Sequence, residues 1–170
     1  MRTVPGSILL LIWLLSTGCP FSQPEVPFES KGPKPKQAVS IPAILATSRD
    51  EAKSRQEIKA IVGTPPAKDD LVSLEWNFPE GRFTVFYFDK KRDFMAFDPK
   101  SPGADSIEDT AALVGIDLKG RRPDEFASRR ASYAYSNLDI NGKTVRADFE
   151  RKDGKISVLR LNESEKPPSN

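Results

Sequence analysis

The sequence contains no histidine and a single cysteine among its 170 residues. Without histidine the chain has no Ser-His-Asp or Cys-His catalytic group and no histidine ligand for zinc. It also lacks the one side chain whose ordinary pKa lies near neutrality. A single cysteine cannot form an internal disulfide or a thiolate metal site. These absences leave binding proteins and enzymes that use carboxylates alone.

The chain also lacks a clear excess of charge of either sign. It has 26 basic and 24 acidic residues, and the four basic and two acidic residues before position 37 account for the net charge of +2. The remainder therefore carries 22 residues of each sign and is neutral. Because a nucleic-acid groove needs a local basic excess, we expect no nucleic-acid partner.

The N-terminus has the composition of an export signal. Arg2 precedes an apolar run over residues 8–15, and three small residues follow at 16–18. A basic start, a short apolar core and a small-residue exit are typical of a secretory signal. Eight apolar residues reach only about 12 Å as a helix, against a hydrocarbon core of roughly 30 Å. We therefore expect residues 1–18 to be a signal peptide rather than a membrane span.

The position of Cys19 suggests a membrane anchor. It directly follows Gly18, and the stretch from Leu15 to Cys19 resembles the lipobox of bacterial lipoproteins, although Ser16 stands where Leu is usual. The resemblance implies that Cys19 carries a lipid that anchors the protein to a membrane. The alternative is ordinary cleavage nearby, which would release a freely secreted protein.

The folded domain is expected to lie between two polar segments. Five prolines and no apolar periodicity mark residues 20–38, so we expect residues 19–39 to form an extended tether of about 60 Å. Residues 162–170 are a polar tail that we expect to be disordered.

An internal repeat organises the part between these segments. Residues 54–63 align without gaps on residues 106–115. In each copy a serine is followed three residues later by an acid, which is a capping pair, and a glycine suited to ending a helix comes last. The pairs are Ser54 with Glu57 and Ser106 with Asp109, and the glycines are Gly63 and Gly115.

Alternating apolar residues after each predicted helix indicate strands. The expected strands are 71–78, 83–88 and 93–97 in the first copy, and 132–136, 143–149 and 155–161 in the second. The sequence therefore predicts an α+β domain over residues 40–161. It would consist of two tandem helix-plus-three-strand antiparallel units, about 50–98 and 104–161, with the helices packed on one face of the sheet.

The first unit resembles the BamE/SmpA group of outer-membrane assembly lipoproteins. The resemblance rests on the capping pair at 54 and 57, on Gly63 and Pro65, on Trp76 and on the stretch Tyr87 to Asp89. The tandem arrangement resembles the β-lactamase-inhibitor-protein fold, although this chain lacks that pattern's disulfide-forming cysteines. These resemblances imply a non-catalytic module that binds an envelope protein, and of the two membranes they favour the outer one, with the module facing the periplasm.

An aromatic strand supplies the candidate binding residues. The strand at 83–88 is apolar on both faces, whereas a sheet covered on one side normally alternates. We predict a protein-binding patch that contains Trp76, Phe86, Tyr87 and Phe88. In the alternative interpretation, the tether or residues 40–46 close the outer face.

Two further groups of charged residues are candidate sites. Arg121 and Arg122 could bind an acidic partner, or they could belong to a solvated loop. Asp89, Asp93 and Asp98 lack the ligand spacing of a calcium loop, so we expect no metal and no cofactor. We expect no enzymatic activity, although paired catalytic carboxylates of the kind glycosidases use cannot be recognised from sequence.

Overall fold

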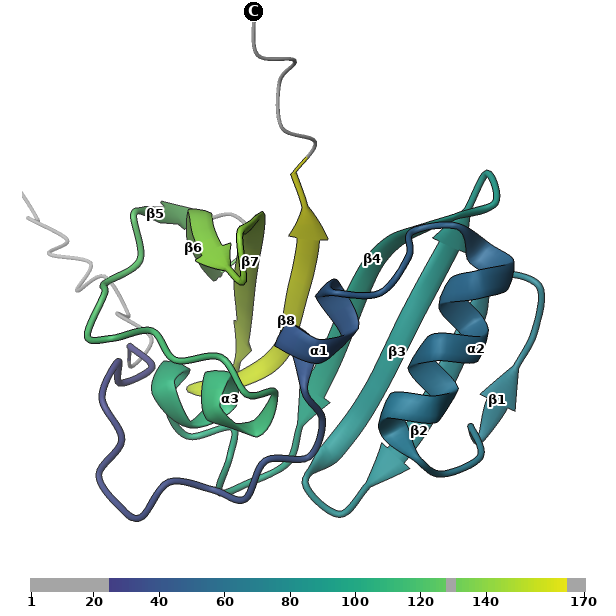
Figure 1. Cartoon of the computed structure of the whole chain (residues 1–170). Helices are drawn as coiled ribbons and strands as arrows, with labels where there is room; N and C mark the ends of the chain where they lie inside the picture. The colour runs from purple at the N-terminus through teal and green to yellow at the C-terminus, as the bar shows by residue number, and fades with distance from the viewer. Residues whose placement is uncertain (1–24, 128–130, 165–170) are drawn as a thin grey trace, which may run out of the picture.

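The computed structural model describes residues 25–127 and 131–164. The described part contains three helices and eight strands (Figure 1). The helices are α1 (Ile41–Leu45), α2 (Glu51–Val62) and α3 (Ile107–Leu113). The strands are β1 (Lys68–Asp69), β2 (Ser73–Phe78), β3 (Gly81–Phe88), β4 (Lys91–Pro99), β5 (Glu125–Ala127), β6 (Ser132–Ile140), β7 (Lys143–Lys152) and β8 (Lys155–Glu163). Within these residues, no helix has the length and apolar character needed to cross a membrane.

All eight strands belong to one antiparallel sheet in the order β1-β2-β3-β4-β8-β7-β6-β5. The sheet consists of two meanders, β1–β4 and β5–β8. They join edge to edge, because Phe94–Phe97 of β4 pair with Leu159–Asn162 of β8. The predicted fold class, two tandem helix-plus-three-strand units, is therefore wrong. The last strand of each meander would otherwise leave a row of main-chain groups unpaired, and pairing the two rows makes the sheet continuous.

The helices depart from the repeat as well. The cap of α2 lies four residues earlier than expected, because the Asp50 side chain accepts from the Lys53 amide at 3.1 Å. Ser54, the predicted cap, therefore lies inside the helix and is fully buried. At α3 the predicted cap is present, since Ser106 Oγ accepts from the Asp109 amide at 2.9 Å. The short α1 helix was not predicted.

Tight turns connect the long strands. Asn141-Gly142 and Asp153-Gly154 have positive φ at both residues, as two-residue hairpin turns of this type require. Asp89 and Lys90 adopt the same conformation without a glycine, at φ of 47° and 58°. The short edge strands β1 and β5 were not predicted.

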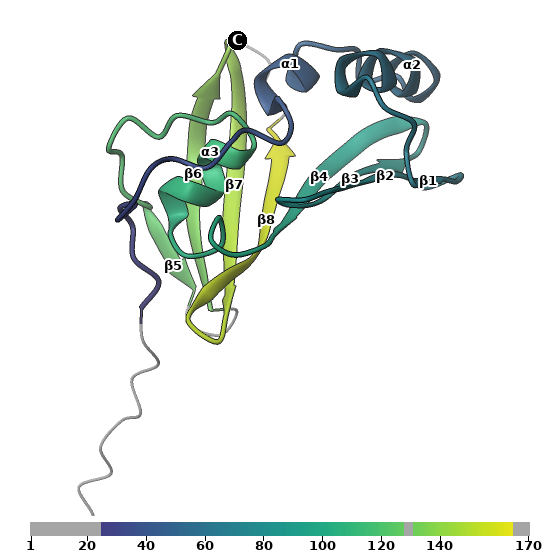
Figure 2. The same ribbon diagram turned by 90° about the horizontal axis from the view of Figure 1, so that it is seen from below.

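The core lies between the helices and one face of the sheet. One row of buried side chains crosses β2, β3, β4, β8, β7 and β6, and a second runs parallel to it. Figure 2 shows α2 lying over one side of β2–β4, and the buried Ser54 of α2 meets the hydroxyl of the buried Tyr87 at 3.4 Å. The first row is Leu74, Val85, Met95, Leu161, Ala147 and Tyr135, and the second begins with Trp76, Phe83, Phe97, Leu159 and Phe149.

A β-bulge places a charged residue in this core. Between Phe86 and Tyr87 the register against β4 shifts by one, so that Phe86 faces Phe94 but Tyr87 faces Arg92. The extra residue re-aims the following side chains, and Arg92 is only 2% exposed. Its guanidinium donates to the Ile44 carbonyl at 2.8 Å and to Glu163 at 3.1 Å. Arg92 therefore ties α1, β4 and the end of β8 together.

The pH dependence of stability follows from Glu163. Burial would raise its pKa, but hydrogen bonds from Lys143 and Arg92 outweigh burial and lower it below the ordinary 4.5. A carboxyl group with a lowered folded-state pKa stabilises the fold above its unfolded-state pKa, and the contribution is lost as the pH falls. We expect the free energy of unfolding to fall below about pH 4.5, and to fall less steeply in Glu163→Gln. Urea unfolding at pH 7, 5, 4 and 3 measures how the free energy of unfolding changes with pH in the parent and in Glu163→Gln. The same pH dependence in both proteins would show that Glu163 is not the responsible group.

Part of the expected tether belongs to the folded domain. Residues 25–39 run along α3, and Val26 and Val39 are 4% and 5% exposed. The carbonyls of Pro27 and Phe28 accept from the first two amides of α3. The C-terminal boundary also differs from the prediction. Residues 162 and 163, which were assigned to the polar tail, belong to β8, which extends to Glu163. The predicted signal peptide and the predicted lipidation site at Cys19 lie outside the described residues.

Candidate functional site

The face of the sheet opposite the helices is the candidate site, and we call it the helix-free face. Residues on it alternate along each strand with the buried core residues, as the pleat of a sheet requires. Register places one such residue from every strand in a single row across the sheet. The row is Lys68, Glu75, Thr84, Ala96, Arg160, Asp148, Ala134 and Glu125. The face is thus a broad surface that both halves of the chain build.

Aromatic side chains gather at one end of this face. The rings of Phe86 and Phe94 stack with centroids 4.3 Å apart and planes at 16°. Phe88, two residues along β3, is 76% exposed. Leu71 and Val72, at 91% and 57%, lie at the same end, because the Tyr87 amide donates to the Val72 carbonyl at 2.9 Å. Val72 has the strand parity of the core residues Leu74 and Trp76. We therefore keep the name apolar end of the helix-free face for Phe86, Phe88 and Phe94, with Leu71 and Val72 exposed at the same end of the sheet.

A shallow hollow of about 570 Å³ lies beside the apolar end, over β1–β4 and β8. Phe86 and Phe94 line it, together with charged groups that are already paired within the chain. Arg82 pairs with Asp98 and lies 4.0 Å from Glu75. Exposed pairs of this kind add little stability. Because these charges are already paired, an apolar group that enters the hollow displaces water from few unpaired charges, and the desolvation cost is low.

The other half of the helix-free face is a network of ion pairs. Arg146 pairs with Asp148 at 2.9 Å and with Glu125 at 3.0 Å, so it joins β7 to the edge strand β5. Hydrogen bonds from Arg146 and Ser136 hold the pKa of Glu125 below its usual value. This half is polar, in contrast to the apolar end.

The structure separates the predicted aromatic patch into two groups. Trp76 is 2% exposed, stacks on Phe83 and donates from Nε1 to the Thr64 carbonyl at 2.9 Å. Tyr87 is 5% exposed and lies beneath the Arg55 guanidinium, and burial raises the pKa of its hydroxyl. Trp76 and Tyr87 are core residues and present no side chain to a partner.

Phe86 and Phe88 lie on the open side. The alternative of a closed outer face needed residues 40–46 or the tether to cover them. In the described structure α1 and residues 25–39 instead lie on the helix side of the sheet. Sequence reasoning missed Phe94, Leu71 and Val72 as surface residues. The signal available was the consecutive apolar pair at 71–72 directly after the turn residue Asp70.

Arg121 and Arg122 hold local structure instead of lining the helix-free face. Arg121 donates to the Asn137 carbonyl at 2.8 Å and pairs with Asp124 at 3.3 Å. Arg122 pairs with Glu29 at 3.3 Å and stacks over Phe28, so it contacts the N-terminal segment. The solvated-loop alternative fits these contacts better than a site for an acidic partner.

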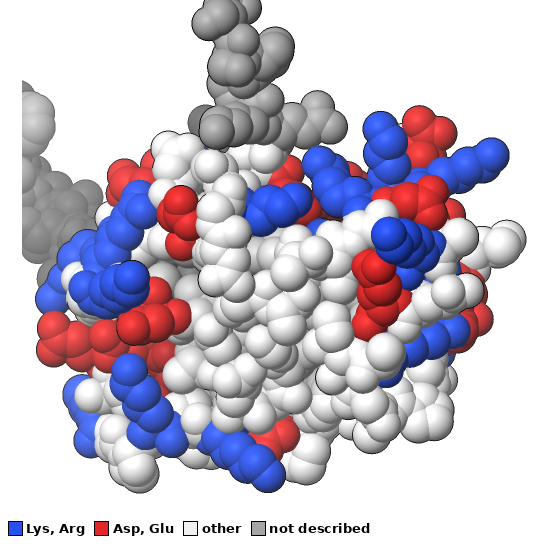
Figure 3. Space-filling model, viewed as in Figure 1, with Lys and Arg blue, Asp and Glu red and all other residues white. Residues whose placement is uncertain are grey.

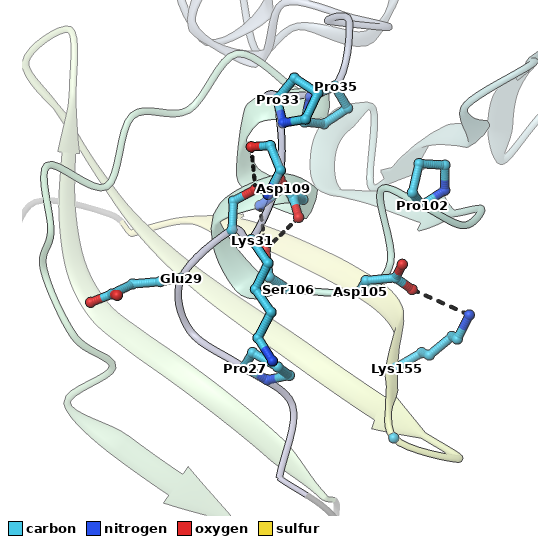
Figure 4. Close-up of a pocket in the computed structure, with 13 residues that line it drawn as sticks. Pro27, Glu29, Lys31, Pro33, Pro35, Pro102, Asp105, Ser106, Asp109 and Lys155 are labelled. Carbon is cyan, nitrogen blue, oxygen red and sulfur yellow. Dashed lines mark hydrogen bonds and ion pairs between the residues drawn. The ribbon is translucent and has the colours of Figure 1, made fainter.

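A separate pocket of about 690 Å³ lies between residues 27–35, the start of α3 and the β7–β8 turn (Figure 4). Four prolines line it. Two acids at its wall are engaged within the chain: Asp105 pairs with Lys155 at 3.2 Å, and Asp109 accepts from Ser106 at 2.7 Å. The pocket thus offers apolar walls and paired charges.

The acids of the described part of the chain do not cluster as metal ligands. Groups of three or more potential ligands are absent there, and Asp89, Asp93 and Asp98 form none. The carboxyl groups with shifted pKa values are Asp70, Asp124, Glu125 and Glu163, and each is shifted downward.

Charges on the helix side are mixed. Figure 3 shows basic and acidic side chains interspersed around a largely uncharged centre. That face carries no broad area of one sign, so it offers no track for a phosphate backbone.

The comparisons with known proteins add no relative: no family model matches the chain, and searches of curated proteins and of solved structures found no match.

Proposed function

We propose that this protein is an exported, lipid-anchored envelope protein that binds a protein partner through its helix-free face and has no catalytic role. The predicted export signal supports export, and the lipobox-like stretch before Cys19 supports lipid anchoring. The position most in keeping with the resemblance is the outer membrane, facing the periplasm. Kinship with the BamE/SmpA lipoproteins and with the inhibitor-protein fold stays a prediction.

The observation that carries the proposal is the exposure of Phe88 and its neighbours on an otherwise polar sheet face. Large apolar side chains that cluster at the surface mark interaction sites more often than single ones do. Phe88, Leu71 and Val72 are each more than half exposed and lie at one end of the sheet. Beside them, the stacked Phe86 and Phe94 offer a flat apolar floor, and aromatic anchors in such a setting dominate interface energies.

Site-specific photocrosslinking tests the proposal in the producing cell. A photoreactive phenylalanine analogue at position 88 is expected to give one adduct of defined mass with an envelope protein. The matched control places the analogue at Lys53, an exposed position on α2 whose side chain is 69% exposed. Equal adducts from both positions, or none from position 88, would refute a specific site on the helix-free face.

Phe88→Ser separates binding from folding. Because Phe88 is mostly exposed, we expect the free energy of unfolding to change by less than about 0.5 kcal/mol. Loss of an aromatic anchor is expected to weaken partner binding by at least about tenfold. Urea unfolding measures the change in stability. Calorimetric titration with the purified partner that the crosslinking experiment identifies measures the change in affinity. A loss of several kcal/mol in stability would show that Phe88 is a structural residue.

A freely secreted protein of the same fold, which binds or inhibits an extracellular enzyme, is the second candidate. Ser16 favours it, because the lipobox position three before the cysteine normally holds Leu. Mass spectrometry of the membrane fraction decides between the two. A diacylglycerol adduct on an N-terminal Cys19 supports the anchored protein, and a soluble product that starts elsewhere supports the secreted one.

A further inference from the structure

The N-terminal segment 25–39 clamps α3 at both ends. At the start of the helix, the Ile107 and Glu108 amides donate to the Pro27 and Phe28 carbonyls, each at 3.1 Å. At its end, the Leu113 carbonyl accepts from the Ala38 amide at 2.7 Å. The first amides and last carbonyls of a helix have no partner within it, so the segment satisfies groups that α3 cannot.

Side chains fix the same segment. Val26 is 4% exposed and belongs to the hydrophobic core, and Phe28 packs against it. The Arg122 guanidinium lies 4.5 Å above the Phe28 ring and pairs with Glu29. Glu108 accepts from the Ser30 amide at 3.3 Å. The folded unit therefore includes residues 26–39 and does not begin near residue 40.

This boundary changes how far an anchored domain can lie from its membrane. Seven residue steps separate Cys19 from Val26. A fully extended chain spans at most about 3.6 Å per residue, which limits the spacer to about 25 Å. A free tether as far as residue 38 would instead reach about 60 Å at the 3.1 Å rise of an extended proline-rich chain.

We propose that the protein, once anchored at Cys19, is held with its folded domain within about 25 Å of the bilayer and acts on partners in that same membrane. The inference rests on the lipid anchor of the proposed function. It narrows the partner class to proteins embedded in or attached to the anchoring membrane.

Chemical anchoring tests the spacing independently of natural lipidation. Cys19 is the only thiol, so the chain from Cys19 onward, which keeps every described residue, can be coupled through it to a maleimide lipid. The support is a phosphatidylcholine bilayer. Neutron reflectometry then measures the water gap between the bilayer and the protein layer. We expect a gap of no more than about 25 Å, and a clearly larger gap would overturn the proposal.

Two variants of the same segment complete the test. Val26→Ser with Phe28→Ser removes the apolar contacts of the clamp, so the gap is expected to widen toward the 60 Å limit. Lys34→Ser with Lys36→Ser changes exposed positions and should leave the gap unchanged. If the first variant keeps the parent's gap, the clamp does not set the spacing. If native Cys19 carries no lipid, the anchor in the proposed function fails while the reflectometry result for the clamp stands.

Discussion

Replacing Arg92 with Met is expected to lower the free energy of unfolding by about 3–5 kcal/mol. The Arg92 side chain is 2% exposed, and its guanidinium bonds the Ile44 carbonyl, Thr47 Oγ1 at 2.7 Å and Glu163. Without it, the Glu163 carboxylate, 7% exposed, keeps Lys143 and the more distant Arg49, while the Ile44 carbonyl loses a charged donor. Because small domains are stable by only about 5–15 kcal/mol, urea unfolding followed by circular dichroism will resolve the loss.

Two further variants show whether the cost comes from a stranded charge. Lys143→Met removes the exposed partner of Glu163, at 42% exposure, and is expected to cost less than about 1 kcal/mol. The double variant Arg92→Met with Glu163→Met removes the carboxylate that Arg92→Met alone strands at this site, so it should be more stable than Arg92→Met alone. A double variant that loses the sum of the single effects would show that the two residues act independently.

The buried position of Arg92 also shows where prediction from sequence stops. Alternation located six strands, because side chains of period two report which residues share a face. A single bulge at the β3–β4 pair reverses that assignment for the residues beyond it, and nothing in the sequence around Asp93 announces the bulge. The sequence pattern also does not show which distant strands pair with each other. The pairing of β4 with β8, and with it the continuous sheet, was therefore missed.

Only part of the candidate site could be predicted, because it depends on tertiary packing as well as on the sequence pattern. The sequence shows that the 83–88 strand has two apolar faces, but not which one the helices cover. That depends on where α2 packs, which the tertiary structure decides. The predicted residues therefore divide, with Tyr87 in the core and Phe88 on the surface. Trp76 was predicted to belong to the patch together with the aromatic residues of the 83–88 strand, yet its indole is buried and hydrogen-bonded.

Trp76→Ala is expected to lower the free energy of unfolding by about 3–5 kcal/mol, the range for removing a large buried aromatic side chain. The variant loses the contact with Phe83, whose ring centroid is 5.9 Å away, and leaves the Thr64 carbonyl without the indole donor. Thermal unfolding measures the loss. Trp76→Phe keeps most of the apolar volume and should lose much less, mainly the hydrogen bond.

The two tryptophan variants distinguish a core residue from a binding residue. If Trp76 acts only through the core, Trp76→Phe remains folded at 25 °C and binds the partner captured at position 88 with parental affinity. Binding by Trp76→Ala should then recover with its folded fraction when the temperature is lowered. A Trp76→Phe protein that unfolds like the parent but binds at least tenfold more weakly would place the indole at the interface, against its 2% exposure.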